Sequence, residues 1–263
     1  MKMSKKGLIF CGCSYVWGYG LNYYYDNSED NGTRYGTISG QYPEPHLLFQ
    51  YAQRFSNKIA NYYNTFHIQP DRVSGSDTVN VDWLQKFLDT DWSECSVDYG
   101  KFSTSDFHTL IFQTSYMDRT IELVWEKLHN RDNEYFNSYE ELAEELGDSR
   151  WQENYYLSQT KKIVTKSVID ICKKFESLGI KVYFVHATDV YKHIDYMKER
   201  TIWVKHKEKE YFSINEISDD DESSVIALDF DSFEGTPPDD LHPSLNVHNS
   251  IYKSIINKLN NND

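Results

Sequence analysis

Short apolar runs alternate with longer amphipathic stretches along the chain. The apolar runs have the length and composition of β-strands, and they cover residues 8–11, 65–69, 109–113, 181–186 and 225–230. Between them, apolar residues recur at helical spacing over residues 47–63, 81–88, 157–178, 190–200 and 244–260. Strands that alternate with helices form βαβ units with right-handed crossovers. The pattern therefore predicts a mostly parallel, five-stranded sheet with helices on both faces.

The longest helical pattern supports this architecture. It ends at Gly179, a residue type that favours helix C-termini, and the apolar run 180–185 that follows is typical of a buried parallel strand. We therefore expect a single α/β domain over residues 1–263, a three-layer α/β/α sandwich of the flavodoxin-like kind. Polar or charged segments predict insertions into this core at residues 26–42, 89–106, 129–153 and 205–224.

A glycine-rich turn directly follows the first expected strand. The strand breaks at Gly12, a hydroxyl follows at Ser14, and Gly18 and Gly20 continue the turn. Ligands of open α/β sheets bind at the carboxyl ends of strands, where the N-terminus of a following helix favours negative charge. A hydroxyl placed there can attack a carbonyl while nearby amides hold the oxyanion that forms. The alternative is a strand-to-helix turn with an incidental serine.

The second candidate segment lies near the C-terminus, where Asp239-x-x-His242-Pro243 precedes the last helical pattern. This spacing lets one turn bring the carboxylate and the imidazole together, and Pro243 suits the entry to a helix. The aspartate then orients the histidine, whose other nitrogen is free to take a proton. The alternative is a helix N-cap followed by a surface histidine.

Together these two segments resemble the first and last sequence blocks of the SGNH (GDSL-type) hydrolase superfamily. Residues 73–77 resemble its second block, whose glycine, here Gly75, contributes an amide to the oxyanion hole beside that of Ser14. Residues 110–119 occupy the place of the third block, and their Gln-Thr-x-x-x-x-Arg form resembles the variant met in large tailed phages. The resemblance implies an α/β/α fold and a triad of Ser14, His242 and Asp239.

Two positions depart from the family pattern. Cys13 stands where the family commonly has aspartate, a change that we expect to affect packing of the turn more than proton transfer. The third block lacks the asparagine that supplies a side-chain donor to the oxyanion hole. Gln113, Thr114 or Ser115 is then the substitute, or the hole consists of the two backbone amides alone. Losing one such donor typically costs about 10²–10³ in rate.

Aromatic residues around the turn indicate the class of substrate. Tyr15, Trp17 and Tyr19 can form a platform for a sugar, or they pack the turn against neighbouring helices. Arg119 can bind a substrate carboxylate or phosphate, or it forms a structural salt bridge. Because the mean hydropathy is −0.68, an esterase acting on a soluble or carbohydrate-linked ester is favoured over a lipase.

Composition limits the partners and the location. A net charge of −14 argues against binding to nucleic acid or to an anionic membrane surface. No apolar run is long enough to span a bilayer, and the first residues do not form a signal peptide, so we expect a cytoplasmic protein, in the host cytoplasm if it is viral. Four cysteines without metal-ligand spacing predict free thiols in a reducing compartment and no metal site. The sequence does not determine the oligomeric state.

The resulting hypothesis is a serine esterase that removes acetyl or other short acyl groups without a metal or organic cofactor. A second interpretation is an SGNH-fold protein, such as a viral accessory factor, that binds a sugar or acylated ligand with weak or no turnover. A nucleotide binder is disfavoured because the turn at residues 12–20 is neither a P-loop nor a G-x-G-x-x-G motif. His186, His193 and His248 are expected to be packed or surface residues.

Overall fold

Four parallel strands form the central sheet of the protein. The computed structural model describes residues 6–13, 16, 21, 35–36, 44–70, 76–90, 101–115, 150–220, 225–229 and 241–261. Within these residues the strands follow the order β3-β1-β4-β5 and pair in parallel throughout. They are β1 (Gly7–Cys11), β3 (His67–Ile68), β4 (Phe107–Thr114) and β5 (Lys181–His186).

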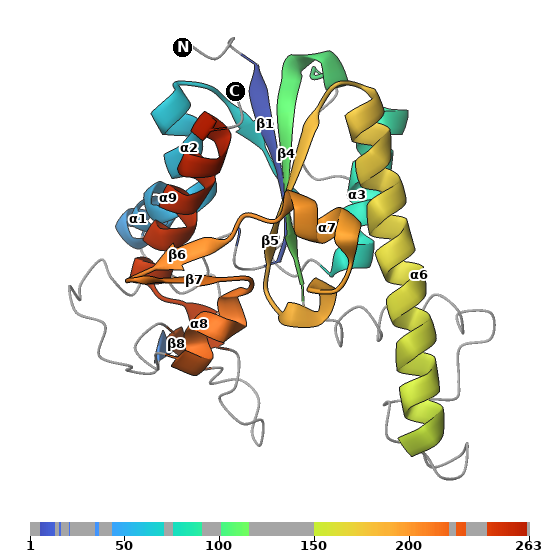
Figure 1. Ribbon diagram of the computed structural model, residues 1–263. Coiled ribbons are helices and arrows are strands. Elements are labelled where there is room, and N and C mark those ends of the chain that lie inside the picture. The colour runs from blue at the N-terminus through green and yellow to red at the C-terminus, as the bar shows by residue number, and fades with distance from the viewer. Residues whose placement is uncertain are drawn as a thin grey trace.

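Helices cover both faces of this sheet (Figure 1). One face carries α3 (Asp77–Asp89), α6 (Arg150–Ser177) and α7 (Asp195–Arg200), and the other carries α2 (Phe55–Tyr63) and α9 (Leu245–Asn261). Side chains of β1 alternate between the two layers. Ile9 and Cys11 join the apolar cluster under α3 and α6, whereas Leu8 and Phe10 join the cluster under α2 and α9. The predicted three-layer α/β/α sandwich is confirmed.

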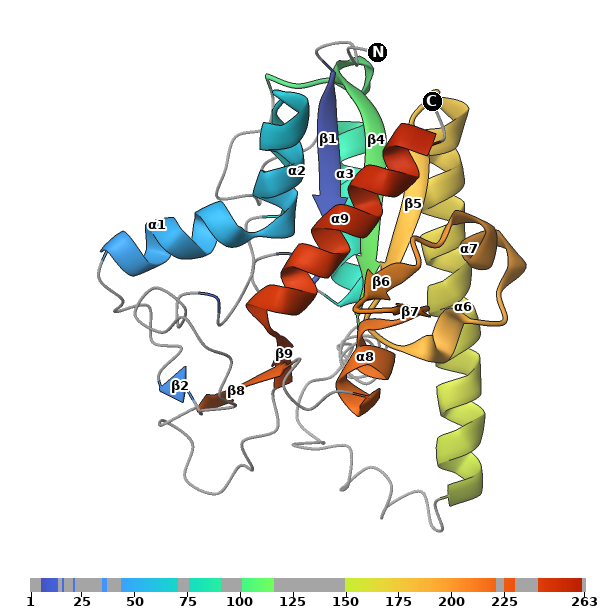
Figure 2. The same ribbon diagram turned by 60° about the vertical axis from the view of Figure 1, so that its left-hand side comes forward.

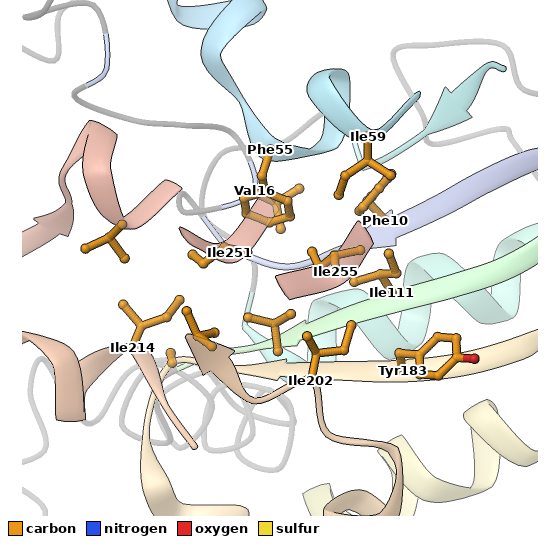
Figure 3. Packing of buried hydrophobic residues seen from close by; sticks show 14 of the residues in the cluster. Phe10, Val16, Phe55, Ile59, Ile111, Tyr183, Ile202, Ile214, Ile251 and Ile255 are labelled. Carbon is orange, nitrogen blue, oxygen red and sulfur yellow. The ribbon is translucent and has the colours of Figure 1, made fainter. Parts of the chain in front are cut away.

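The apolar cluster under α2 and α9 unites distant parts of the chain (Figure 3). Phe10 of β1 meets Phe55 of α2 edge to face, with their ring centroids 6.1 Å apart. Ile251 and Ile255 of α9 are completely buried in the same cluster. This cluster also contains Val16, which lies beyond the end of β1. The last helix therefore shares one apolar cluster with the first strand and with the start of its turn.

Two helix ends show how local sequence sets the element boundaries. Ser76 caps α3, because its hydroxyl accepts a hydrogen bond from the Val79 amide at 3.3 Å. At the end of α6, Gly179 adopts a φ of +80°, and the Ile180 amide donates back to the Phe175 carbonyl at 3.1 Å. The chain then enters β5 at Lys181, as the sequence predicts.

The single helix expected over residues 47–63 is two helices. The structure has α1 (Glu44–Gln53) and α2, and Arg54 between them adopts an extended backbone with a ψ of 137°. The Arg54 guanidinium is buried and lies 4.1 Å from the centre of the Tyr51 ring. Burial lowers the pKa of Arg54 to about 10. The bend at this one residue thus separates the two helices and places a buried side chain between them.

The fifth strand expected in the central sheet lies elsewhere, so the prediction of five strands there is wrong for the part that the structure describes. The run at 225–230 forms β8 (Val225–Asp229), which pairs in parallel with β2 (Tyr35–Gly36) and antiparallel with β9 (Leu241–Pro243). The outer edge of β5 is instead occupied by single parallel bridges from Phe184 to Thr201 and from His186 to Ser213. A strand cannot join an edge that is already paired.

The predicted insertion at 205–224 contains regular structure. A hairpin of β6 (Val204–His206) and β7 (Lys209–Tyr211) leads into α8 (Ile214–Asp220), and the described segments also include the short 3₁₀ turns η2 (Thr104–Asp106) and η3 (Asp189–Tyr191). Asp220, at the end of α8, accepts hydrogen bonds from Lys209 and from the Tyr211 hydroxyl. Among the helices that the structure describes, none has both the length and the apolar character needed to cross a bilayer.

Candidate functional site

Buried polar side chains gather where β1, β4 and α3 meet at the carboxyl ends of the parallel strands. Figure 2 shows β1 and β4 running toward the end of the molecule where β8 and β9 lie. Gln113, Thr114 and Ser115 at the end of β4 are all at most 1% exposed. Asp77 and Asn80, from the first turns of α3, are completely buried beside them. This edge of the sheet is where ligands of open α/β proteins bind.

The turn after β1 is held by two side-chain amides. The Gly12 amide donates to Oδ1 of Asn80 at 3.2 Å. The Cys13 amide and the Cys13 thiol both donate to Oε1 of Gln113, at 3.1 and 3.2 Å. A Cβ atom at Gly12 would lie 2.4 Å from Cγ2 of Val16 and 2.6 Å from Oε1 of Gln113. Only glycine therefore fits at the point where the turn leaves the strand.

A buried carboxyl group joins three segments behind this turn. Oδ1 of Asp77 accepts a hydrogen bond from the Ser115 amide at 2.7 Å, and Oδ2 accepts one from the Tyr191 hydroxyl at 2.6 Å. Burial raises the pKa of Asp77 to about 7, although both hydrogen bonds act in the opposite direction. Burial and the adjacent Asp77 likewise raise the pKa of Tyr191. Asp77 thus ties α3 to the end of β4 and to η3.

His186, at the end of β5, is locked by a chain of hydroxyl groups. The Thr201 hydroxyl donates to the Met197 carbonyl at 2.8 Å, so it accepts from Nε2 of His186 at 3.1 Å. Nδ1 of His186 then accepts from the Thr114 hydroxyl at 3.2 Å. The imidazole stacks on Phe212 with centroids 4.4 Å apart, and burial lowers its pKa to about 3. A neutral, fully hydrogen-bonded ring is a packed residue, as the sequence predicts.

Two hydrogen-bond donors near the turn are buried without a partner among the residues that the structure describes. They are Nδ2 of Asn80 and Oγ of Ser115. The opposite atom of the Asn80 carboxamide is already engaged with Gly12, and the Ser115 amide is engaged with Asp77. Leaving a buried donor unpaired costs about 1–3 kcal/mol, so proteins retain such groups where they serve a purpose.

Most of the residues predicted for catalysis lie outside the described residues. These are Ser14, Tyr15, Trp17, Tyr19, Gly75, Arg119 and Asp239. Gln113 and Thr114, which were expected near the oxyanion hole, do lie at the carboxyl end of β4, but their polar groups are engaged. The Gln113 amino group donates to the Thr114 carbonyl, and the Thr114 hydroxyl donates to His186.

His242 lies in strand β9, where it pairs with Ile226. The expected helix entry at Pro243 is wrong, because Pro243 also belongs to β9 and the helix begins at Leu245. Ser244 provides the cap, since its hydroxyl accepts from the Val247 amide at 3.4 Å. His242 therefore precedes α9 by three residues, just before the N-terminal end of the helix.

Sequence reasoning missed Asp77, Asn80 and Tyr191 as members of this group. The predicted helix started at residue 81, which left the two α3 residues outside it. A serine directly before an amphipathic stretch can signal a helix cap. A cap at Ser76 places Asp77 and Asn80 on the first turns of the helix. Their spacing of three residues would then have put them on one face.

The thiols agree with a structural role. Cys11 and Cys172 are free thiols, and both are completely buried, as is the Cys13 side chain. Burial raises the pKa of the Cys11 and Cys172 thiols well above the usual value, which disfavours the reactive thiolate. Within the described ranges, no three His, Cys, Asp or Glu side chains come together in a way that could hold a metal ion.

No family model and no curated protein matches this chain. Among solved structures, the fold is similar to that of an acetyl xylan esterase, Est2A, from the rumen bacterium Butyrivibrio proteoclasticus, with a TM-score of 0.48 and 10% sequence identity. The match covers 99% of this chain and 64% of that protein, so this chain spans less than two thirds of its length. A likeness of this extent carries no argument about activity, and the chemistry of the site rests on its own residues.

Proposed function

We propose that this protein is a serine esterase in which Ser14 is the nucleophile, His242 the general base and Asp239 the residue that orients His242. The substrate class is an ester of a short acyl group, acetyl first, carried by a soluble or carbohydrate alcohol. Tyr15, Trp17, Tyr19 and Arg119 are the residues that we assign to substrate binding.

The observation that carries the proposal is a single apolar cluster shared by the two ends of the chain. Cys13 and Val16, which flank Ser14 in the sequence, are buried in the same cluster as Val247 and Ile251 of α9. His242 precedes Val247 by five residues. Residues that flank the proposed nucleophile and residues that follow the proposed base, more than 200 positions apart in the sequence, thus belong to one packed unit, and this supports the proposal.

The reaction follows from these roles. His242 removes the proton of the Ser14 hydroxyl as its oxygen attacks the acyl carbonyl, and the Ser14 and Gly75 amides bind the oxyanion. His242 then protonates the leaving alcohol, and the C–O bond to that alcohol breaks. Water, deprotonated by His242, cleaves the acyl-enzyme and regenerates Ser14. Gln113 and Thr114 hold the framework of the site, because their own polar groups are already bonded.

Labelling with a fluorophosphonate probe tests the assignment. The wild-type protein should be tagged at Ser14 and should release acetate from acetylated sugars, whereas Ser14→Ala and His242→Ala should do neither. His193→Ala, at an exposed histidine after β5, is the matched control and should be labelled like the wild type. A wild-type protein that is not labelled, yet is stabilised against heat by acetylated sugars, would refute the esterase and support a ligand-binding role.

A further inference from the structure

The two unpartnered donors belong to the end of β4 and the start of α3, two segments that a hydrogen bond between Ser115 and Asp77 joins. Asn80 contacts the Gly12 amide, and Gly12 begins the turn that contains Ser14. Ser115 follows β4 directly, and its amide is bound by Asp77, which is three residues before Asn80 on the same helix face. β1 and β4 are neighbouring strands, with Cys11 paired to Phe112. Both donors are therefore within the same corner of the sheet.

The direction of the Asn80 carboxamide is determined by its partner. The Gly12 amide can only donate, so the atom that it meets must be the carbonyl oxygen. The amino group of Asn80 is then the free end, and it is buried without a partner among the described residues. The Asn80 side chain is completely buried, so no flexible, solvated arrangement compensates for this loss.

We propose that Nδ2 of Asn80 and the Ser115 hydroxyl are the side-chain donors that bind the carbonyl oxygen of the substrate as it becomes an oxyanion. This assignment rests on the proposed function and deepens it, because it names donors for the hole that the third block leaves incomplete. Desolvated, fixed donors gain most when negative charge develops on the oxygen that they bind. The energy that the free protein loses on two unpaired groups is recovered in the transition state.

Neighbouring side chains are less suited to this task. The Gln113 amide is engaged at both ends, with Cys13 and with the Thr114 carbonyl. The Thr114 hydroxyl is engaged with His186. Recruiting either group requires breaking a buried hydrogen bond, which costs about as much as the new one yields. Asn80 and Ser115 require no such exchange.

Asn80→Asp is the decisive variant, because it keeps the oxygen that accepts from Gly12 and removes the amino group. We expect kcat for p-nitrophenyl acetate at pH 8 to fall about 10²–10³-fold, with KM changed less than about threefold, as for loss of one oxyanion donor. The rate of fluorophosphonate labelling should fall in parallel. Asn61→Asp, which adds the same charge on the exposed face of α2, is the matched control and should leave both rates unchanged.

Thermal melting shows whether each variant is folded. If Asn80→Asp does not fold, Ser115→Ala decides, with an expected fall in kcat of about tenfold or more. A folded Asn80→Asp or Ser115→Ala protein whose kcat is within about twofold of the wild type overturns the proposed donor pair. In that case the wild-type protein is still labelled at Ser14. If the wild-type protein itself is not labelled, the proposed function fails and the donor pair fails with it.

Discussion

The buried carboxyl of Asp77 should make the stability of the protein depend on pH in a defined direction. Burial raises its pKa from 3.8 to about 7 in the folded state. A carboxyl with a raised folded pKa binds its proton more tightly on folding, so its contribution to stability is complete below about pH 4 and is lost as pH rises through about 7. Each pKa unit is worth about 1.36 kcal/mol, so the loss approaches about 4 kcal/mol.

Asp77→Asn should remove this dependence. The asparagine oxygen can accept from the Ser115 amide, and its amino group can donate to the Tyr191 hydroxyl after that hydroxyl turns. We therefore expect the variant to equal the wild type at pH 4 within about 1 kcal/mol and to exceed it at pH 8 by up to about 4 kcal/mol. Urea unfolding from pH 4 to pH 8, followed by tryptophan fluorescence, measures both curves.

A matched control removes a carboxylate from the other end of the same helix. Asp89→Asn changes an exposed residue and should leave the difference from the wild type the same at every pH. The reasoning is refuted if Asp77→Asn is less stable than the wild type at pH 8 by more than about 2 kcal/mol, because the ionised carboxylate would then be stabilising.

Two further substitutions test the turn and the cluster that anchors it. Gly12→Ala places a Cβ 2.4 Å from Val16 and 2.6 Å from Gln113, so it should destabilise the fold by about 1–3 kcal/mol and abolish fluorophosphonate labelling; labelling at the wild-type rate would contradict the tight fit. Ile251→Ala should lower the free energy of unfolding by about 2–5 kcal/mol in urea, whereas Ile163→Ala, at a side chain that is 55% exposed, should change it by less than about 0.5 kcal/mol. Equal effects of the two isoleucine variants would show that the cluster does not anchor α9.

The core of the fold was predictable because its elements carry strong local patterns. The strand expected at 181–186 coincides with β5, and the expected strands at 8–11 and 109–113 lie within β1 and β4. Periodicity identifies a strand, but it does not identify the partner of that strand. The run at 225–230 was therefore assigned to the central sheet, although single bridges from Thr201 and Ser213 already occupy the β5 edge.

The candidate site was only partly predictable for a related reason. Gln113 and Thr114 could be placed at the carboxyl end of a strand from the apolar run before them, whereas Asp77 and Asn80 lie on a buried helix face where a pattern-based method expects apolar residues. Burial of a polar group can be predicted only when its partners are known. The partners of these two residues are about 40 to 115 positions away in the sequence.

The packing of α9 on β1 has a consequence for synthesis of the protein. Leu8 and Phe10 leave the ribosome long before the helix that completes their cluster, because Ile251 at the middle of that helix follows about 240 residues later. Synthesis proceeds at about 5–20 residues per second, so the apolar face of this strand stays exposed on the nascent chain for on the order of 10–50 s. Early packing of the emerging α2, whose Phe55 and Ile59 belong to the same cluster, or binding by a chaperone would shorten that exposure.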